Sequence, residues 1–151
     1  MKNKRGFTLI ELLVVIAIIG VLSAVVLASL NTARSKGNDA AVQTDMEGIR
    51  NQAQIYYGDH TNSYGVAGTN GSSCALADNA GNLFEDATVA RQITGADTAN
   101  GAAAGMTCNV SGTAYAASAA LVATPGSYYC VDSTGAGMTT TNALGTNTAC
   151  S

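Results

Sequence analysis

Hydrophobic residues are concentrated near the N-terminus, where they form one long block. The segment from Phe7 to Leu30 is dense in Leu, Ile, Val and Ala, and no charged residue occurs from Leu12 to Leu30. As an α-helix, residues 12–30 would extend about 28 Å at a rise of 1.5 Å per residue. That length is close to the hydrocarbon thickness of a bilayer, roughly 30 Å. The pattern predicts a helix that spans a membrane.

After Leu30 the pattern changes from apolar on all sides to amphipathic. Apolar residues recur at spacings of four, three, four and three, which places them on one face of a helix; they are Val42, Met46, Ile49, Ala53 and Tyr56. We therefore predict one helix from about Phe7 to Tyr57, whose second half packs against a globular head. Gly58 and the polar residues 59–63 end it.

The next part of the chain has weaker signals. Residues 58–82 are rich in Gly, Asn, Ser and Thr and are expected to form a loop. Asn82 resembles a helix N-cap, with Glu85 as the acid of a capping box. This predicts a short helix over 83–94 that Gly95 ends, followed by a loop over 95–107.

The clearest strand signals come late in the sequence. Thr113–Ala123 is small and apolar, and residues 128–131 have high β-propensity. Between them, residues 124–127 read Thr-Pro-Gly-Ser, which suits a turn. A hairpin is expected, with a third strand near 137–141. The predicted fold class is α+β: a long N-terminal helix packed by its second half on a small antiparallel β-sheet head with disulfides.

Composition narrows the possible partners of the chain. The 151 residues suffice for one compact domain with an appendage, and only 11% of them are charged. The net charge of −3 does not indicate sequence-specific binding to nucleic acid, which would need a basic face. Three of the seven cations lie in the first five residues (Lys2, Lys4 and Arg5), which favours a cytoplasmic N-terminus and export of the remainder.

All four cysteines lie in the second half of the chain, at Cys74, Cys108, Cys130 and Cys150. An even count, wide spacing and an export-like N-terminus favour two disulfides in an oxidising compartment. Three connectivities are possible. We favour Cys74–Cys108 with Cys130–Cys150, because these pairs close loops without crossing the predicted hairpin.

No residue pattern indicates an enzyme. The single histidine, His60, follows the predicted helix in a polar stretch and is expected to be a solvated surface residue rather than a metal ligand. Glu85 and Asp86 are adjacent on the predicted short helix, so they point to different faces. The glycines lack the spacing that cradles phosphates. We expect no catalytic residue, no metal site and no cofactor.

Glu11 is unusual for a simple anchor. A carboxylate near the start of a spanning segment costs several kcal/mol unless it is neutralised or paired. The nearest cation that could pair with it would be a newly exposed α-amine.

The sequence Gly-Phe-Thr-Leu-Ile-Glu, after a basic leader and before an apolar helix, resembles the class III signal of the type IV pilin and pseudopilin family. The resemblance implies that a prepilin peptidase cuts between Gly6 and Phe7 and that Phe7 is then N-methylated. It implies that Glu11 neutralises the N-terminal amine of a neighbouring subunit during assembly. The family often closes its C-terminal region with a disulfide, which favours Cys130–Cys150.

The resemblance also implies an organisation for the whole chain. Residues 1–6 would be a cleaved leader, 7–30 a transmembrane and filament-core helix, 31–57 its amphipathic continuation and 58–151 the globular head. The implied function is a structural subunit of a type IV pilus-like filament used in adhesion, motility or DNA uptake. The precursor would lie in the inner or cytoplasmic membrane, and the assembly machinery would move it into a homo-oligomeric helical filament at the cell surface.

Four alternatives stay open. A type II secretion pseudopilin shares this N-terminal chemistry, although the absence of Trp removes the Pro-Trp-Gly element found in major pseudopilin heads. A monomeric surface-binding domain with a plain anchor would not depend on Glu11. A conventional secretory signal could be cut after Ala28, behind the residues Val26-Leu27-Ala28. A permanent single-pass anchor is the fourth, and it also leaves Glu11 unexplained.

Overall fold

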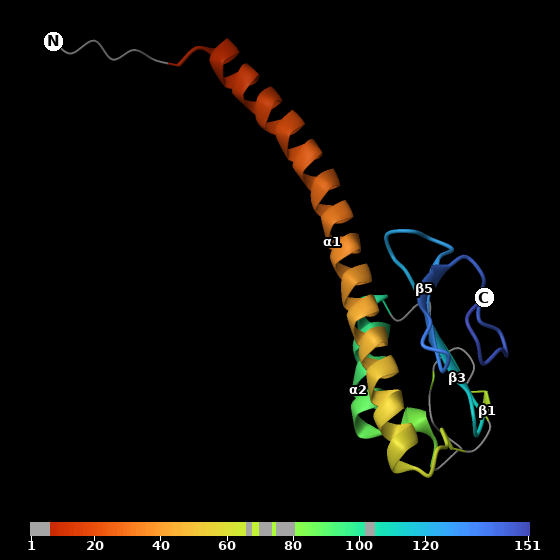
Figure 1. Cartoon of the computed structure of the whole chain (residues 1–151). Coiled ribbons are helices and arrows are strands. Elements are labelled where there is room, and N and C mark those ends of the chain that lie inside the picture. Colours follow the sequence, from red (N-terminus) through yellow and green to blue (C-terminus); the bar gives the residue numbers. More distant parts are fainter. Residues whose placement is uncertain (1–6, 66–67, 70–73, 75–80, 102–104) are drawn as a thin grey trace. The chain divides into compact units, whose positions relative to one another are not determined.

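The computed structural model describes residues 7–65, 68–69, 74, 81–101 and 105–151 (Figure 1). The chain forms two compact units, residues 1–34 and residues 35–151. Within the described residues, the elements are the helices α1 and α2, a short 3₁₀-helix η1 and the strands β1–β5. Helix and antiparallel sheet occur in the expected combination, so the predicted α+β class is confirmed.

Helix α1 runs from Leu9 to Asp59, within two residues of both predicted ends. In the first unit, the large apolar side chains of α1 are all exposed. Among the described residues, α1 is the one helix whose length and composition would allow it to cross a membrane.

In the second unit, α1 buries the predicted apolar line. Val42, Met46, Ile49 and Ala53 are completely inaccessible to solvent, and Tyr56 is almost so. These side chains form one hydrophobic core with residues of η1, α2 and the sheet. The 3.6-residue period of the sequence thus identified the face of α1 that packs on the head.

A helical segment follows residue 82 as predicted, but its start and end were predicted incorrectly. The side chain of Asn82 caps only η1 (Leu83–Glu85), where it accepts the N–H of Phe84 at 2.9 Å. The cap of α2 (Ala87–Ala99) is Asp86, whose carboxylate accepts the N–H groups of Thr88 and Val89. Glu85 does not close a capping box on Asn82, because its carboxylate accepts the N–H of Gly81.

Gly95 does not end α2, and the predicted loop over 95–107 is wrong in part. The helix continues four residues further, to Ala99. The reason for a glycine at position 95 is the close approach of α1, because an added Cβ would lie 2.5 Å from Oδ2 of Asp45. Gly95 is therefore a packing residue inside a helix.

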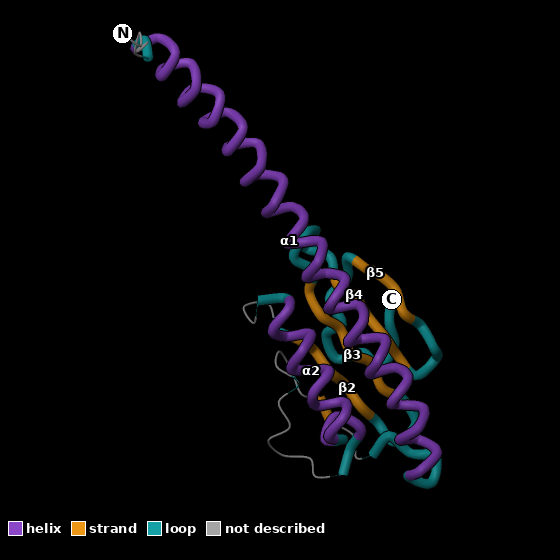
Figure 2. The backbone as a smooth tube through the Cα atoms, turned by 90° about the vertical axis from the view of Figure 1, so that its left-hand side faces the viewer, coloured by secondary structure: helices purple, strands orange, loops and turns teal. Residues whose placement is uncertain are grey.

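The sheet is antiparallel and its strands lie in chain order, β1-β2-β3-β4-β5; Figure 2 labels β2 to β5. The predicted hairpin consists of β3 (Tyr115–Ala120) and β4 (Tyr128–Asp132). In its turn, Ser127 donates its N–H to the carbonyl of Thr124, and Gly126 has a φ of 83°. The third predicted strand is present as β5 (Gly137–Thr140).

Two strands were not predicted. β1 (Gly68–Thr69) lies inside the expected loop over 58–82, and β2 (Met106–Val110) overlaps the end of the expected loop over 95–107. Each pairs with its neighbour, so they extend the hairpin on the β3 side. The sequence Met-Thr-Cys-Asn-Val of β2 alternates apolar and polar residues, a signal that could have identified it.

Strand β3 is rich in alanine because it is buried on both faces. Ala117 and Ala119 belong to the core beneath the helices, whereas Ala116 belongs to a smaller cluster with Cys130 and Leu144 on the other side. Small side chains let both layers approach the sheet closely. Tertiary packing therefore overrides the helix propensity of alanine.

Candidate processing and assembly site

The first turn of α1 is closed by reciprocal hydrogen bonds between Thr8 and Glu11. Oε2 of Glu11 accepts the backbone N–H of Thr8 at 2.8 Å and its hydroxyl at 2.7 Å. The N–H of Glu11 donates to Oγ1 of Thr8 at 3.3 Å. This is a capping box, in which an N-cap Thr and an acid three residues later satisfy each other's backbone donors.

The prediction for Glu11 concerned the cost of its charge in a membrane and its pairing with an amine, and it missed this capping of the first turn. The signal was present, because Thr-Leu-Ile-Glu before an apolar run is a capping-box sequence. The box holds the carboxylate at the positive end of the helix dipole, where a negative charge is favoured. The hydrogen bonds from Thr8 also fix the orientation of the Glu11 carboxylate at the start of α1.

Phe7 directly precedes the capping box. Its side chain is 84% exposed, and it lies outside α1. Gly6, the other residue of the predicted cleavage bond, lies outside the described residues. Because Phe7 and Thr8 are consecutive, cleavage at this bond would create an amine one residue from the backbone N–H that Glu11 accepts.

The apolar segment that follows has no cover in its own compact unit. From Leu9 to Leu30, the large side chains are between 48% and 75% exposed, a continuous apolar surface that a soluble monomer would rarely present to water. Gly20 has open space around it, because a Cβ added there would meet nothing within 4 Å. The segment therefore needs lipid or another protein chain as its environment.

The four cysteines are joined in the two pairs favoured above. Cys74 is bonded to Cys108, with a Cα–Cα distance of 5.1 Å, and Cys130 to Cys150, with 5.9 Å. Cys130 lies on β4, so its bond fastens the segment after β5 to the sheet. Both bonds belong to the head.

His60 contacts Tyr56 of α1. Its ring stacks on Tyr56 with centroids 3.8 Å apart, and its Nδ1 lies 2.9 Å from the carbonyl oxygen of Tyr56. Within the described ranges, no three His, Cys, Asp or Glu side chains are grouped so that they could hold a metal ion. Glu85 and Asp86 each accept local backbone N–H groups, as described above.

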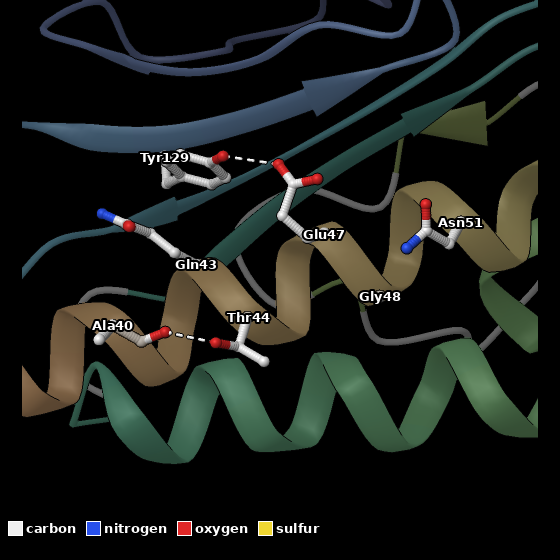
Figure 3. Close-up of a pocket in the computed structure, with 7 residues that line it drawn as sticks. All are labelled: Ala40, Gln43, Thr44, Glu47, Gly48, Asn51 and Tyr129. Atoms are coloured by element: carbon white, nitrogen blue, oxygen red, sulfur yellow. Dashed lines mark hydrogen bonds between the residues drawn. The ribbon is translucent and has the colours of Figure 1, made fainter.

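An open groove of about 540 Å³ follows α1 on the head (Figure 3). Its lining is mostly small or uncharged and consists of Ala40, Gln43, Thr44, Glu47, Gly48, Asn51 and Tyr129. The one carboxylate in it, that of Glu47, accepts the hydroxyl of Tyr129 and is paired with Arg50. The groove thus contains no acid or base that is free for proton transfer.

Comparison with known proteins agrees with this interpretation of the N-terminus. Residues 1–27 match the family described as the prokaryotic N-terminal methylation motif. The chain is 45% identical over 64 residues to the type IV wide pilus major component PilA4 of Thermus thermophilus. The match covers 42% of this chain and 48% of that protein, so the chain aligns with about half of its relative. No solved structure matches the chain.

The matched motif coincides with the structural features of the N-terminus. It contains the Gly6–Phe7 bond, the capping box and most of the exposed apolar segment. Over this segment, the chain is therefore similar to proteins that carry the methylation motif, and over 64 residues it is similar to a type IV pilus component.

Proposed function

We propose that the chain is a structural subunit of a type IV pilus-like extracellular filament and that it assembles through the apolar part of α1. The observation that carries the proposal is an uncovered apolar helix that begins with Phe7 and the Thr8–Glu11 capping box. Lipid covers this helix in the precursor, and copies of the same helix cover it in the filament. The role is structural and not catalytic.

Processing precedes assembly. A prepilin peptidase removes residues 1–6 and methylates the amine of Phe7. Glu11 then neutralises the amine of a neighbouring subunit, and the pilus assembly machinery draws the subunit from the inner or cytoplasmic membrane into a surface filament. The relative's name supports a pilus, because that protein is a major component of a type IV wide pilus.

The first test is the mass of the N-terminal peptide of chain recovered from the cell surface. The expected peptide starts at Phe7 and is heavier by one methyl group. A peptide that starts at Ser29, or one that still starts at Met1, would contradict the proposal, because it would indicate a conventionally secreted or simply anchored domain.

The second test separates assembly from processing. Glu11→Ala should leave a subunit that is cleaved and held in the membrane but yields few filaments after shearing. Asp59→Ala is the matched control, since Asp59 is an exposed acid at the other end of α1. Wild-type filament yield from Glu11→Ala would refute the assigned role of Glu11.

A further inference from the structure

We propose that Asp39, Glu47 and Arg50 of α1, with their partners on β4 and in the loops before and after it, form a clasp that resists sliding of α1 along β4. Its use in the cell rests on the proposed filament function, in which tension enters each head through α1. The clasp itself is a property of residues 35–151 and is argued from contacts within that unit.

The first link of the clasp is Asp39. Its Oδ1 accepts the N–H of Val122 at 2.6 Å and that of Ala123 at 3.2 Å, and its Oδ2 accepts the N–H of Ala123 at 3.1 Å. Asp39 is 9% exposed, so these bonds to a charged acceptor are largely shielded from water. Charge-assisted bonds of this kind are stronger than neutral ones.

The second and third links lie further along α1. Glu47 accepts the hydroxyl of Tyr129 at 2.6 Å (Figure 3). Burial and the hydrogen bond to Glu47 raise the pKa of Tyr129 to about 12, so the hydroxyl stays a donor at neutral pH. Arg50 forms an ion pair with Glu47 and donates to the carbonyl of Gly135 at 3.1 Å.

A glycine on the neighbouring strand leaves room for these two links. Gly137 is the first residue of β5, and an added Cβ there would collide with Oε1 of Glu47 and lie 2.9 Å from Nη1 of Arg50. The side chains of Glu47 and Arg50 thus lie directly against the sheet.

The partners of the clasp follow one another along the chain in the same order as Asp39, Glu47 and Arg50 do along α1. From Asp39 to Arg50, α1 rises about 16 Å. Over the same length, the partners progress from residues 122–123 before β4, through Tyr129 within β4, to Gly135 after it. The two elements therefore run side by side in the same direction.

This arrangement makes the response to force directional. A pull along α1 toward its N-terminus loads all three links at once, whereas a force that lifts one end of α1 loads them one after another. The buried apolar line adds attraction between helix and sheet, but hydrophobic contact is non-directional. Hydrogen bonds depend on distance and angle, so they fix the axial position of the helix.

The test is mechanical unfolding of the full chain in detergent, with handles at two pairs of positions. Handles at Lys36 and Thr134 pull α1 along β4. Handles at Asn51 and Thr134 lift α1, because these residues adjoin the bonded pair Arg50 and Gly135. The shared handle at position 134 makes its own effect common to both. The expected result is a larger rupture force for the sliding geometry than for the lifting geometry.

Variants then assign that difference to the clasp. Asp39→Ala and Tyr129→Phe should each remove much of the excess force in the sliding geometry, while Asp59→Ala should leave both forces unchanged. Tyr129→Phe loses only a hydroxyl, so it keeps the test valid if Asp39→Ala fails to fold. Equal forces in the wild type, or variants that lower both forces in proportion, would overturn the clasp. Because isolated chains are measured, failure of the filament proposal would leave this result intact.

Discussion

The buried carboxylate of Asp132 accepts the backbone N–H of Cys150 at 2.8 Å, which joins the end of β4 to the segment after β5. Its other oxygen accepts the N–H and hydroxyl of Thr134 and the N–H of Ala136. Asp132 is 1% exposed. One side chain therefore shapes the β4–β5 turn and fixes the residue that forms the second disulfide.

These bonds predict how the stability of the head depends on pH. Burial alone would raise the pKa of Asp132, but the bonds donated by Thr134, Cys150 and Ala136 outweigh it and hold the pKa below its ordinary value of 3.8. A carboxyl with a lowered pKa in the folded state stabilises that state above its unfolded pKa. The contribution is lost as the pH falls through the lower folded pKa.

Asp132→Asn should therefore lower the free energy of unfolding near neutral pH by about 2 kcal/mol, the typical value for hydrogen bonds to a charged group. The difference from wild type should shrink as the pH falls below 3.8. Urea unfolding of both proteins at a series of pH values measures it. A difference that stays constant down to acid pH would show that the charge of Asp132 is unimportant.

The disulfide between Cys130 and Cys150 should stabilise the head mainly by restricting the unfolded chain. Its partners are 20 residues apart, for which the loop-entropy relation gives about 3 kcal/mol. Replacing both cysteines by serine should lower the unfolding free energy by that amount. The same change at Cys74 and Cys108, which are 34 residues apart, should cost slightly more. Unchanged urea midpoints in both double variants would contradict this.

Replacement by alanine should change the stability of the protein in opposite directions at two glycines, Gly65 and Gly58. Gly65 has a φ of 107°, and an added Cβ would collide with the backbone of Asn82 and the carbonyl of Gly81. Gly65→Ala should destabilise the head by about 1–3 kcal/mol. Gly58 lies in α1 with open space around it. Gly58→Ala should therefore stabilise the folded protein by up to about 1 kcal/mol. Thermal unfolding of both variants tests the contrast.

The capping box predicts an effect of Thr8 on the start of α1. Thr8→Val removes the hydroxyl that donates to Glu11 and accepts from its N–H. Hydrogen exchange at the amides of Thr8 and Glu11 should become faster in detergent, and Glu11 should lose its fixed orientation. Thr8→Ser keeps the hydroxyl and should restore wild-type exchange. If valine and serine gave the same rates, the box would not order this turn.

Elements that are marked by a local pattern of apolar residues or by turn residues were predictable from the sequence. The apolar block and the line that starts at Val42 give α1, and Pro125-Gly126 between a small apolar run and a β-prone run gives the hairpin. β2 was missed because five alternating residues are a weak signal in a stretch rich in Ala and Gly. At Gly95, the partner that explains the glycine lies on another helix, so residue type alone predicted a helix end.

The long-range polar contacts could not have been predicted. Asp39 binds backbone groups more than 80 positions away, at Val122 and Ala123. Nothing in its own neighbourhood distinguishes it from a solvated helix acid, and the same holds for Glu47 and its bond to Tyr129. By contrast, the first turn of α1 was within reach, because Thr8 and Glu11 are three residues apart.

The order of the strands has a consequence for how the head folds. Each strand pairs with the strand directly before or after it in the chain, so no strand has to be inserted between two others. From β2 to β5, neighbouring strands are joined by short loops, which favours rapid folding, whereas residues 70–105, which include η1 and α2, separate β1 from β2. A head that emerges N-terminus first can add its strands in the order in which they appear. Cys150 lies after β5 in the chain. Its disulfide with Cys130 can therefore form once strands β1 to β5 have paired, and it then stabilises the completed sheet.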